Sequence, residues 1–251
     1  MRMTQPRPTI PIAPASNALV RAACKACSLQ ELCLPVGLSD DEIDQLDRII
    51  SARQSARRGT YLYRIGDPFR NLYAVRSGAF KTVDISEDGS EKITGFYLSG
   101  EILGLDAIST ERQNFGAIAL EDSEVCVVPF PRLEELLREI PALQHHFHKI
   151  MSRDIVRDQG LMLLLAGMKA DARLSAFLIG LAQRYASRGY SATRFRLRMT
   201  REEIGSYLGL TLETVSRLFS RFAEEGLIRV DRRELEIVDQ KGLRAIVDQR
   251  D

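Results

Sequence analysis

The four cysteines of this 251-residue chain are the residues whose type and spacing best suit chemistry. Cys24, Cys27 and Cys33 fall within one short stretch, whereas Cys126 stands alone among valines. A secreted disulfide framework would be denser and would need an export signal, so ligation of a metal or a cluster is the better interpretation. Four thiolates suit an iron–sulfur cluster, and they also suit a tetrahedral structural zinc site. The spacing by itself leaves both open, and Cys126 taken alone reads as a buried core thiol.

A second set of chemically capable side chains lies near the C-terminus, on a predicted helix with two faces. One face is apolar and consists of Val215, Leu218, Phe219 and Phe222. The other face carries Glu213, Ser216 and Arg217. Arginine suits the acceptor edge of guanine, and glutamate suits a base amino group. We therefore predict base readout by this face, with an ordinary solvated helix surface as the alternative.

A helix and a tight turn precede that helix. Thr200 and Glu203 form a capping box, Gly209 ends the helix that follows, and Thr211 caps the next one. A helix, a glycine-containing turn and a second helix are typical of a helix-turn-helix.

The segment after the two helices predicts a two-stranded hairpin with a basic tip, which would be the wing. Arg232 and Arg233 lie at that tip, where they would contact phosphates without reading sequence. The chain carries a net charge of only +1, yet residues 184–233 contain eleven Lys and Arg against six Asp and Glu. The positive charge is therefore concentrated where DNA binding is predicted.

The middle of the chain supplies the elements that must position these residues. From about Gly59 to Pro129, short runs of Tyr, Val, Ile and Phe alternate with glycine turns, a pattern typical of an antiparallel β-roll or barrel. After Pro131 the pattern becomes helical. Met151, Ile155, Asp158 and Met162 are spaced by 4, 3 and 4 residues, like the seam of a coiled coil that needs a partner helix. The alternative is a helix packed on its own β-roll.

Composition sets the broad class. A hydrophobic content of 45% is enough for a real core, and the length suits two domains. We found neither a signal peptide nor an apolar run long enough to span a membrane, so we expect a cytoplasmic protein without membrane contact. No dinucleotide loop or catalytic constellation accompanies the cysteines, so we expect no enzyme.

Four motifs together resemble the fumarate and nitrate reduction (FNR) regulators of the CRP/FNR superfamily. They are the run Cys24 to Cys33, the segment Lys92 to Phe96, the helix Asp158 to Leu165, and the run Leu210 to Arg217. The resemblance implies an α+β fold with a cyclic-nucleotide-binding-like β-roll, a long dimerisation helix and a winged helix-turn-helix. We expect an arm at 1–36, the β-roll at 37–140, the dimerisation helix at 141–170 and the DNA-binding domain at 171–251.

The resemblance also implies a mechanism. Cys24, Cys27, Cys33 and Cys126 would bind a [4Fe–4S] cluster that promotes dimerisation without oxygen. The homodimer would then bind palindromes of the TTGATnnnnATCAA type and activate or repress genes of anaerobic metabolism. Asp158 would face its symmetry mate at the seam, so that dimerisation is marginal until the cluster repositions this region.

Further features concern partners and alternatives. The hairpin 86–90 resembles a loop that family members present to RNA polymerase, with Ser90 where an acidic residue can occur.

A regulator with a different effector is an alternative, but residues 111–116 lack the Arg-Ser/Thr pair that grips a cyclic phosphate, so we expect no cyclic nucleotide. An iron–sulfur electron carrier is the alternative from another class. His145, His146 and His148 are interpreted as a solvated helix face rather than a metal site.

Overall fold

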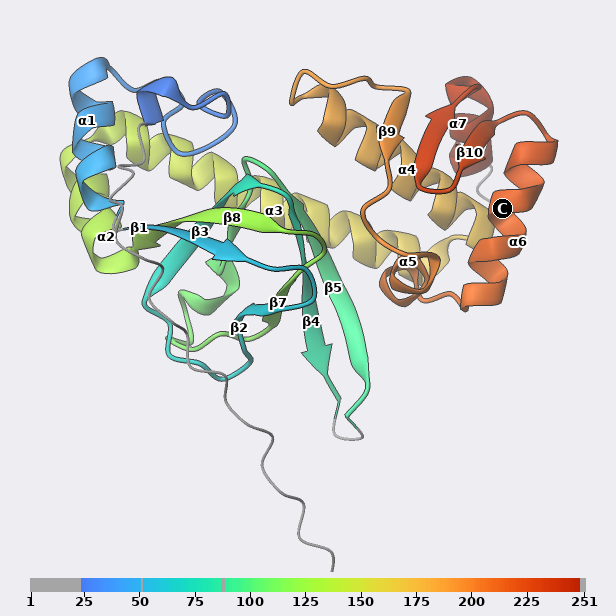
Figure 1. The fold of residues 1–251 in the computed structure, drawn as a ribbon, viewed down its shortest axis with the longest axis horizontal. Helices are drawn as coiled ribbons and strands as arrows, with labels where there is room; N and C mark the ends of the chain where they lie inside the picture. The colour runs from blue at the N-terminus through green and yellow to red at the C-terminus, as the bar shows by residue number, and fades with distance from the viewer. Residues whose placement is uncertain (1–23, 51, 87–88, 249–251) are drawn as a thin grey trace, which may run out of the picture.

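The computed structural model describes residues 24–50, 52–86 and 89–248. The chain forms two parts joined by the long helix α3 (Pro141–Gly167), as Figure 1 shows. One part is a β-roll flanked by helices and by the cysteine-containing segment, and the other is a helical part with a small sheet. None of the helices in these described ranges has the length and hydropathy of a membrane span.

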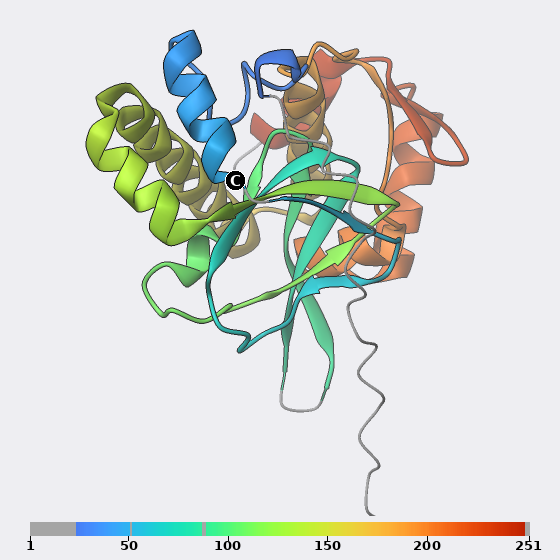
Figure 2. The same cartoon turned by 60° about the vertical axis from the view of Figure 1, so that its left-hand side comes forward.

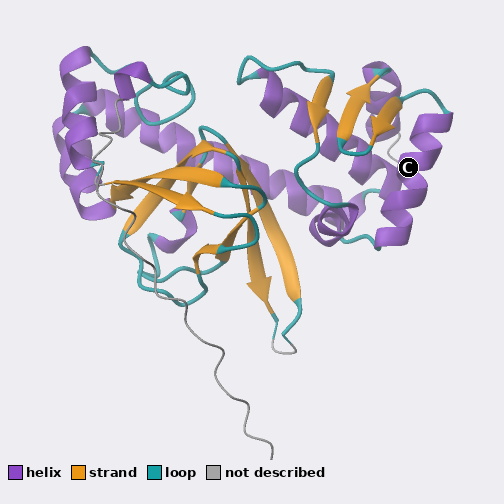
Figure 3. Cartoon of the chain, viewed as in Figure 1, coloured by secondary structure: helices purple, strands orange, loops and turns teal. Residues whose placement is uncertain are grey.

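The β-roll consists of two four-stranded antiparallel sheets, with strand orders β1-β8-β3-β6 and β2-β7-β4-β5 (Figure 3). The strands are β1 (Ala52–Ala56), β2 (Tyr61–Tyr63), β3 (Asn71–Ser77), β4 (Ala79–Ile85), β5 (Glu91–Leu98), β6 (Ile102–Leu103), β7 (Gly116–Ala119) and β8 (Ser123–Pro129), with the 3-10 helix η2 (Leu105–Ala107) after β6. The predicted antiparallel roll is confirmed. The expected start near Gly59 was wrong, because β1 precedes it. The sequence of β1, Ala-Arg-Gln-Ser-Ala, lacks the usual strand formers and is held in place by pairing with β8.

Helices α1 (Asp40–Ile49), α2 (Phe130–Glu139) and the first half of α3 lie side by side along one edge of the roll (Figure 2). The predicted capping box at the start of α1 is present: the Ser39 hydroxyl accepts from the Glu42 amide, and the Glu42 carboxylate accepts from the Ser39 amide. The buried side chains of these helices share one core with the cysteine segment, including Leu34, Leu46, Leu143 and Phe147. This core fixes the cysteine segment against the roll.

Helix α3 changes its environment along its length. Leu143, Phe147 and Ile150 are buried in the core of the roll. Beyond them, Ile155 is 57% exposed and Met162 is 69% exposed. Packing on the chain's own roll is therefore confirmed for the first half. In the second half Ile155 and Met162 are exposed, and the coiled-coil seam stays a prediction.

The C-terminal part contains the predicted helix-turn-helix and a larger sheet than expected. Its elements are α4 (Ala170–Ala186), β9 (Arg194–Arg196), α5 (Arg201–Leu208), α6 (Leu212–Glu224), β10 (Ile228–Asp231), β11 (Glu234–Ile237) and α7 (Gln240–Asp248). The wing hairpin β10–β11 is present, but the prediction of two strands was incomplete. Strand β9 pairs with β11 and makes a three-stranded sheet of order β10-β11-β9.

Candidate cysteine site and DNA-binding helices

The segment from Cys24 to Leu38 is a compact series of turns that begins with the 3-10 helix η1 (Cys24–Ala26). The amide of Cys27 donates to the Cys24 carbonyl at 3.0 Å, and the amide of Cys33 donates to the Leu29 carbonyl at 3.0 Å. These turns bring three cysteines of the segment to one side of the roll. We refer to residues 24–33 as the cysteine loop.

Cys126 reaches the same place from the sheet. It lies on β8, paired with Arg53 of β1 and with Ala74 of β3. All four cysteines are half-buried free thiols, and all four line one cavity. The rest of the lining is mainly apolar and comprises Leu29, Gln30, Leu34, Pro35, Leu46, Ile50, Ala74, Val75, Arg76 and Val128. The structure thus brings together the four predicted ligands.

The chemistry of the donor set suits a four-iron cluster. Four thiolates are the usual ligand set of such a cluster, which is bound at its separate iron atoms. Four thiolates are also the ligand set of a tetrahedral zinc site, which needs them to converge on one point. Within the described ranges, no three Cys, His, Asp or Glu side chains lie close enough together to hold one metal ion.

Burial raises the pKa of three of these thiols. Burial raises the pKa of Cys33 to about 12, against a smaller opposing effect of the Leu34 amide. For Cys24, burial and then the Asp47 carboxylate raise the pKa. Burial also raises the pKa of Cys126, although Arg76 opposes it. The surroundings of these three side chains therefore favour neutral thiols, and a bound cation would favour the thiolates that ligation requires.

Two polar side chains hold the ends of the cysteine loop. The Asp47 carboxylate of α1 accepts from the Cys24 amide at 2.9 and 3.1 Å. His146 Nε2, on α3, lies 2.9 Å from the Cys33 carbonyl oxygen. Because a carbonyl can only accept, this Nε2 carries the hydrogen, and burial lowers the pKa of the imidazole.

The interpretation of the three histidines as one solvated face was wrong for His146. His145 and His148 are exposed, but His146 is only 7% exposed. The spacing of Leu143, His146, Phe147 and Ile150 is i, i+3, i+4, i+7, which could have signalled a position on the buried face. Asp47 carried no comparable signal.

The recognition helix α6 has the two predicted faces. Val215, Leu218, Phe219 and Phe222 are buried. On the other side, Glu213 and Arg217 are exposed and Ser216 is half-buried. Thr211 caps the helix, and its hydroxyl accepts from the Thr214 amide at 3.2 Å. The polar side chains are therefore available to a partner, as base readout requires.

The turn between α5 and α6 depends on two glycines. Gly209 has a φ of 63°, in the left-handed region that favours glycine. A Cβ on Gly205 would lie 2.7 Å from the carbonyl oxygen of Leu210, so only glycine lets the turn close this tightly. Gly209 was predicted from the sequence, whereas the need for Gly205 became evident only from the packing of the turn.

The two predicted wing arginines differ in setting. Arg232 is exposed at the tip between β10 and β11, with a φ of 54°. Arg233 is half-buried, and its carbonyl accepts from the Leu197 amide at 2.8 Å. Arg232 is thus the freer of the two to reach a phosphate.

The predicted seam of α3 also divides. Ile155 and Met162 are exposed, whereas Met151 is half-buried and packs against the core of the roll. The Asp158 side chain is 67% exposed, and its carboxylate lies 3.6 Å from Nε of Arg157. Arg157 is thus a weak ion-pair partner of Asp158 within the described part of the chain.

Comparison with known proteins places these features in one family. The Crp-like helix-turn-helix domain matches residues 172–246, and the cyclic nucleotide-binding domain matches residues 53–139. The chain is 47% identical over 230 residues to the transcriptional activator protein anr of Pseudomonas aeruginosa, which covers 92% of this chain and 94% of that protein. It is 43% identical over 223 residues to the fumarate and nitrate reduction regulatory protein of Salmonella typhimurium, covering 89% of each. The chain belongs to the FNR/Anr-type regulators of the CRP/FNR family.

A solved structure agrees with this membership. FixK2 from Bradyrhizobium japonicum is similar with a TM-score of 0.72 and 28% identity, over 78% of this chain and 96% of that one. The predicted family, fold class and absence of an enzymatic role are therefore confirmed. The chain is a DNA-binding transcription regulator.

In this regulator the DNA-binding part is docked on the roll through a central carboxylate. Glu101, after β5, pairs with Arg184 of α4 at 2.6 Å and with Arg188, in the turn just after α4, at 2.5 Å. The Leu98 amide also donates to this carboxylate at 3.0 Å. Burial would raise the pKa of Glu101, but the two guanidinium groups outweigh it and lower the pKa to about 2.

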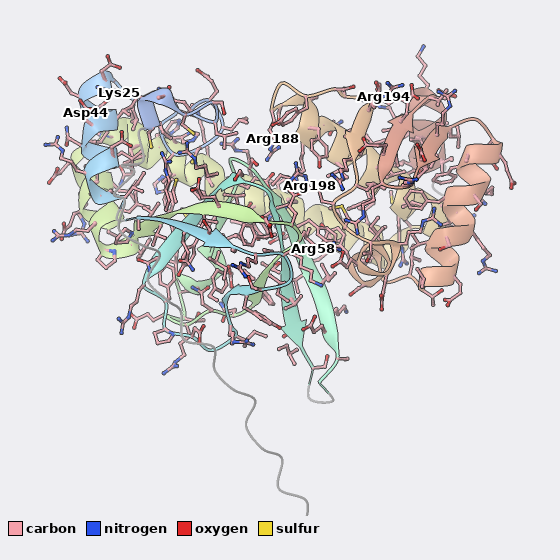
Figure 4. All side chains as sticks on the ribbon, in the orientation of Figure 1. Lys25, Asp44, Arg58, Arg188, Arg194 and Arg198 are labelled. Carbon is pink, nitrogen blue, oxygen red and sulfur yellow. The ribbon has the colours of Figure 1, made fainter. Side chains whose placement is uncertain are left out.

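Other contacts surround this junction. Lys81 pairs with Glu203 at 3.0 Å, and Arg198 pairs with Glu121. The rings of Phe96 and Tyr207 lie 5.0 Å apart, within a core that extends from the roll into the C-terminal part. Figure 4 shows Arg188 and Arg198 between the two parts. Reasoning from the sequence missed this junction because its partners are far apart along the chain.

The same junction bears on the nucleotide alternative. The Glu101 carboxylate is engaged by Arg184 of α4. Arg112, in the segment that lacks the phosphate-gripping pair, donates to the Gly66 carbonyl at 3.0 Å. Both side chains are thus engaged within the protein, and the expectation that no cyclic nucleotide binds stays a prediction.

Proposed function

We propose that this regulator responds to oxygen through a [4Fe–4S] cluster bound by Cys24, Cys27, Cys33 and Cys126. The observation that carries the proposal is that four free thiols, from the cysteine loop and from β8, line one mainly apolar cavity. When bound, such a cluster supplies iron and sulfide that oxygen can oxidise and dismantle. The ligands would then tie the loop to the sheet only while oxygen is absent.

The second half of α3 supports dimerisation as the response. Ile155, Val156, Met162 and Leu163 are all more than half exposed, a concentration of apolar surface that suits a partner helix. We infer that the cluster-loaded protein pairs through the seam of Met151, Ile155, Asp158 and Met162. Asp158 would face its symmetry mate, where two carboxylates oppose pairing until the region is repositioned.

The dimer would bind DNA through two copies of α6. Glu213, Ser216 and Arg217 would read the half-sites of a TTGATnnnnATCAA-like palindrome, and Thr211, Arg232 and Arg233 would lie near phosphates. Binding would activate or repress genes of anaerobic metabolism. The names of the relatives, a transcriptional activator and a fumarate and nitrate reduction regulator, support this role.

RNA polymerase is the remaining proposed partner. It would contact the hairpin 86–90, of which Glu87 and Asp88 lie outside the described residues. The Gly89 amide donates to the Ser86 carbonyl at 2.8 Å, and this hydrogen bond closes the hairpin.

The cluster is tested by purifying the protein without oxygen and measuring iron, sulfide, zinc and sedimentation before and after air. We expect about four irons per protomer and a dimer that dissociates in air. Cys126→Ser should lose most of the iron and the dimer. Val127→Ser is the matched control, since Val127 is the neighbour of Cys126 on β8 but does not line the cavity. A zinc-containing or air-indifferent dimer would overturn the sensor and leave the DNA-binding assignment intact.

Base readout is tested by titrating the palindrome and a scrambled duplex. Arg217→Ala should lose about 1–3 kcal/mol of discrimination between the two. Arg221→Ala removes an equal charge from the same helix, but Arg221 pairs with Asp171 at 3.0 Å. We expect this control to weaken both duplexes alike or not at all; equal loss of discrimination in both variants would contradict base readout by Arg217.

A further inference from the structure

His146 is the buried polar side chain that joins the cysteine loop to the dimerisation helix. Its side chain lies in the core with Phe147 and Ile150 on one side of α3, and its Nε2–H donates to the Cys33 carbonyl at 2.9 Å. Cys33 is one of the four proposed ligands. The hydrogen bond therefore runs from the peptide of a ligand directly to α3.

The same helix carries the exposed apolar seam. Ile155 lies nine positions after His146, which corresponds to about 14 Å of continuous helix. A packed helix transmits a displacement as a rigid element rather than absorbing it. A shift of the Cys33 peptide must then either move α3 or leave a buried imidazole donor without its acceptor, which is unfavourable.

We propose that His146 is a positioning residue that couples the state of the cysteine loop to the dimer seam of α3. This inference rests on the proposed function, because it assumes that the cluster controls dimerisation. Ligation at Cys33 holds the carbonyl where His146 donates to it, and this bond holds α3 in the orientation that pairs. Loss of ligation frees the carbonyl and with it the orientation of the helix.

The test compares three variants of the full-length protein, purified without oxygen. His146→Leu fills the same buried position with an apolar side chain and removes the donor, whereas His146→Gln introduces a side-chain amide that can donate to the carbonyl. His148→Leu is the control, because His148 is exposed on the same helix. For each we would measure iron and sulfide content and the dimer dissociation constant before and after air.

We expect His146→Leu to bind iron and sulfide. In this variant, the fold-change in dimer dissociation constant caused by air should be about tenfold smaller than in the native protein. His146→Gln should recover most of that change, and His148→Leu should retain all of it. A His146→Leu protein with the full native change would overturn the inference alone. A native protein that never loads iron and sulfide would overturn the proposed function first, and the coupling with it.

A measurement on the native protein covers the case in which His146→Leu does not fold. Nitrogen-15 NMR of the histidines should show His146 as the Nε2–H tautomer, with its hydrogen protected from solvent exchange in the anaerobic protein and exchanging at least tenfold faster after air. Equal protection before and after air would overturn the coupling.

Discussion

The cysteine loop and the junction around Glu101 both attach a segment of the chain to the β-roll, but they do so with different groups. The loop surrounds a mainly apolar cavity with half-buried thiols and is held at its ends by Asp47 and His146. At the junction, one carboxylate receives two guanidinium groups and a backbone amide. The junction is thus satisfied by the protein's own charges, whereas the loop is held by Asp47, by His146 and by the exposed pair of Lys25 with Asp44.

Because of this difference, the cysteine loop can respond to metal binding or oxidation, whereas the junction should not. A buried ion pair with all its partners in place is costly to break, so the DNA-binding part should stay docked on the roll over a wide range of conditions. Thiols change their bonding when metal binds or oxygen attacks, so the loop can change without unfolding the rest. The two regions are in contact. A Cβ added to Gly100, the residue before Glu101, would lie 3.0 Å from the Cβ of Leu32 in the cysteine loop.

The largest effect is expected from neutralising the junction. Glu101→Gln leaves Arg184 and Arg188 without their carboxylate and should reduce the free energy of unfolding by about 3 kcal/mol in urea at pH 7. Glu135→Gln is the control, because Glu135 forms an exposed pair with Arg132. We expect that control to cost less than about 0.5 kcal/mol. Equal, small costs for both variants would mean that the junction is no firmer than an ordinary surface pair.

The pH dependence of the unfolding free energy should also depend on the ion pairs of Glu101. Because the pKa of Glu101 is lowered from 4.5 to about 2 in the folded protein, its contribution is fully present above pH 4.5. It is lost as the pH falls from 4.5 towards 2, by at most about 3 kcal/mol. The difference in unfolding free energy between native protein and Glu101→Gln should therefore shrink on acidification. Parallel curves from pH 6 to pH 3 would contradict this assignment.

The smallest effect on overall stability is expected at the cysteine loop. Asp47→Asn keeps an oxygen for the Cys24 amide but removes its charge, so it should cost only about 1 kcal/mol. The Cys24 amide should nevertheless exchange with solvent deuterium several-fold faster, because the opening is local. Asp44→Asn is the control: Asp44 also lies on α1, but its partner in the loop is Lys25, and a pair this exposed should contribute little. Faster exchange at the junction as well as in the loop would show that the two regions are not independent.

Elements with regular patterns were predictable because the pattern itself is the physical cause. The two faces of α6 follow from helical periodicity, and the capping boxes at Ser39 and Thr200 follow from the need of the first amides for acceptors. Strand β1 was missed because its residues have little intrinsic strand preference and depend on β8. The third strand of the wing sheet, β9, was missed because three residues carry no readable period.

The family, the helix-turn-helix with its Glu213 and Arg217, and the choice of four cysteines followed from the amino-acid sequence, because these depend on residue type and local spacing. Which surfaces meet became evident only from the folded chain. Folding brought Cys126 to the cysteine loop, buried His146 under Cys33 and joined Glu101 to Arg184 and Arg188. Each of these contacts links residues between 83 and 113 positions apart. Such contacts form only when packing of the whole core closes the intervening chain, and no local pattern records them.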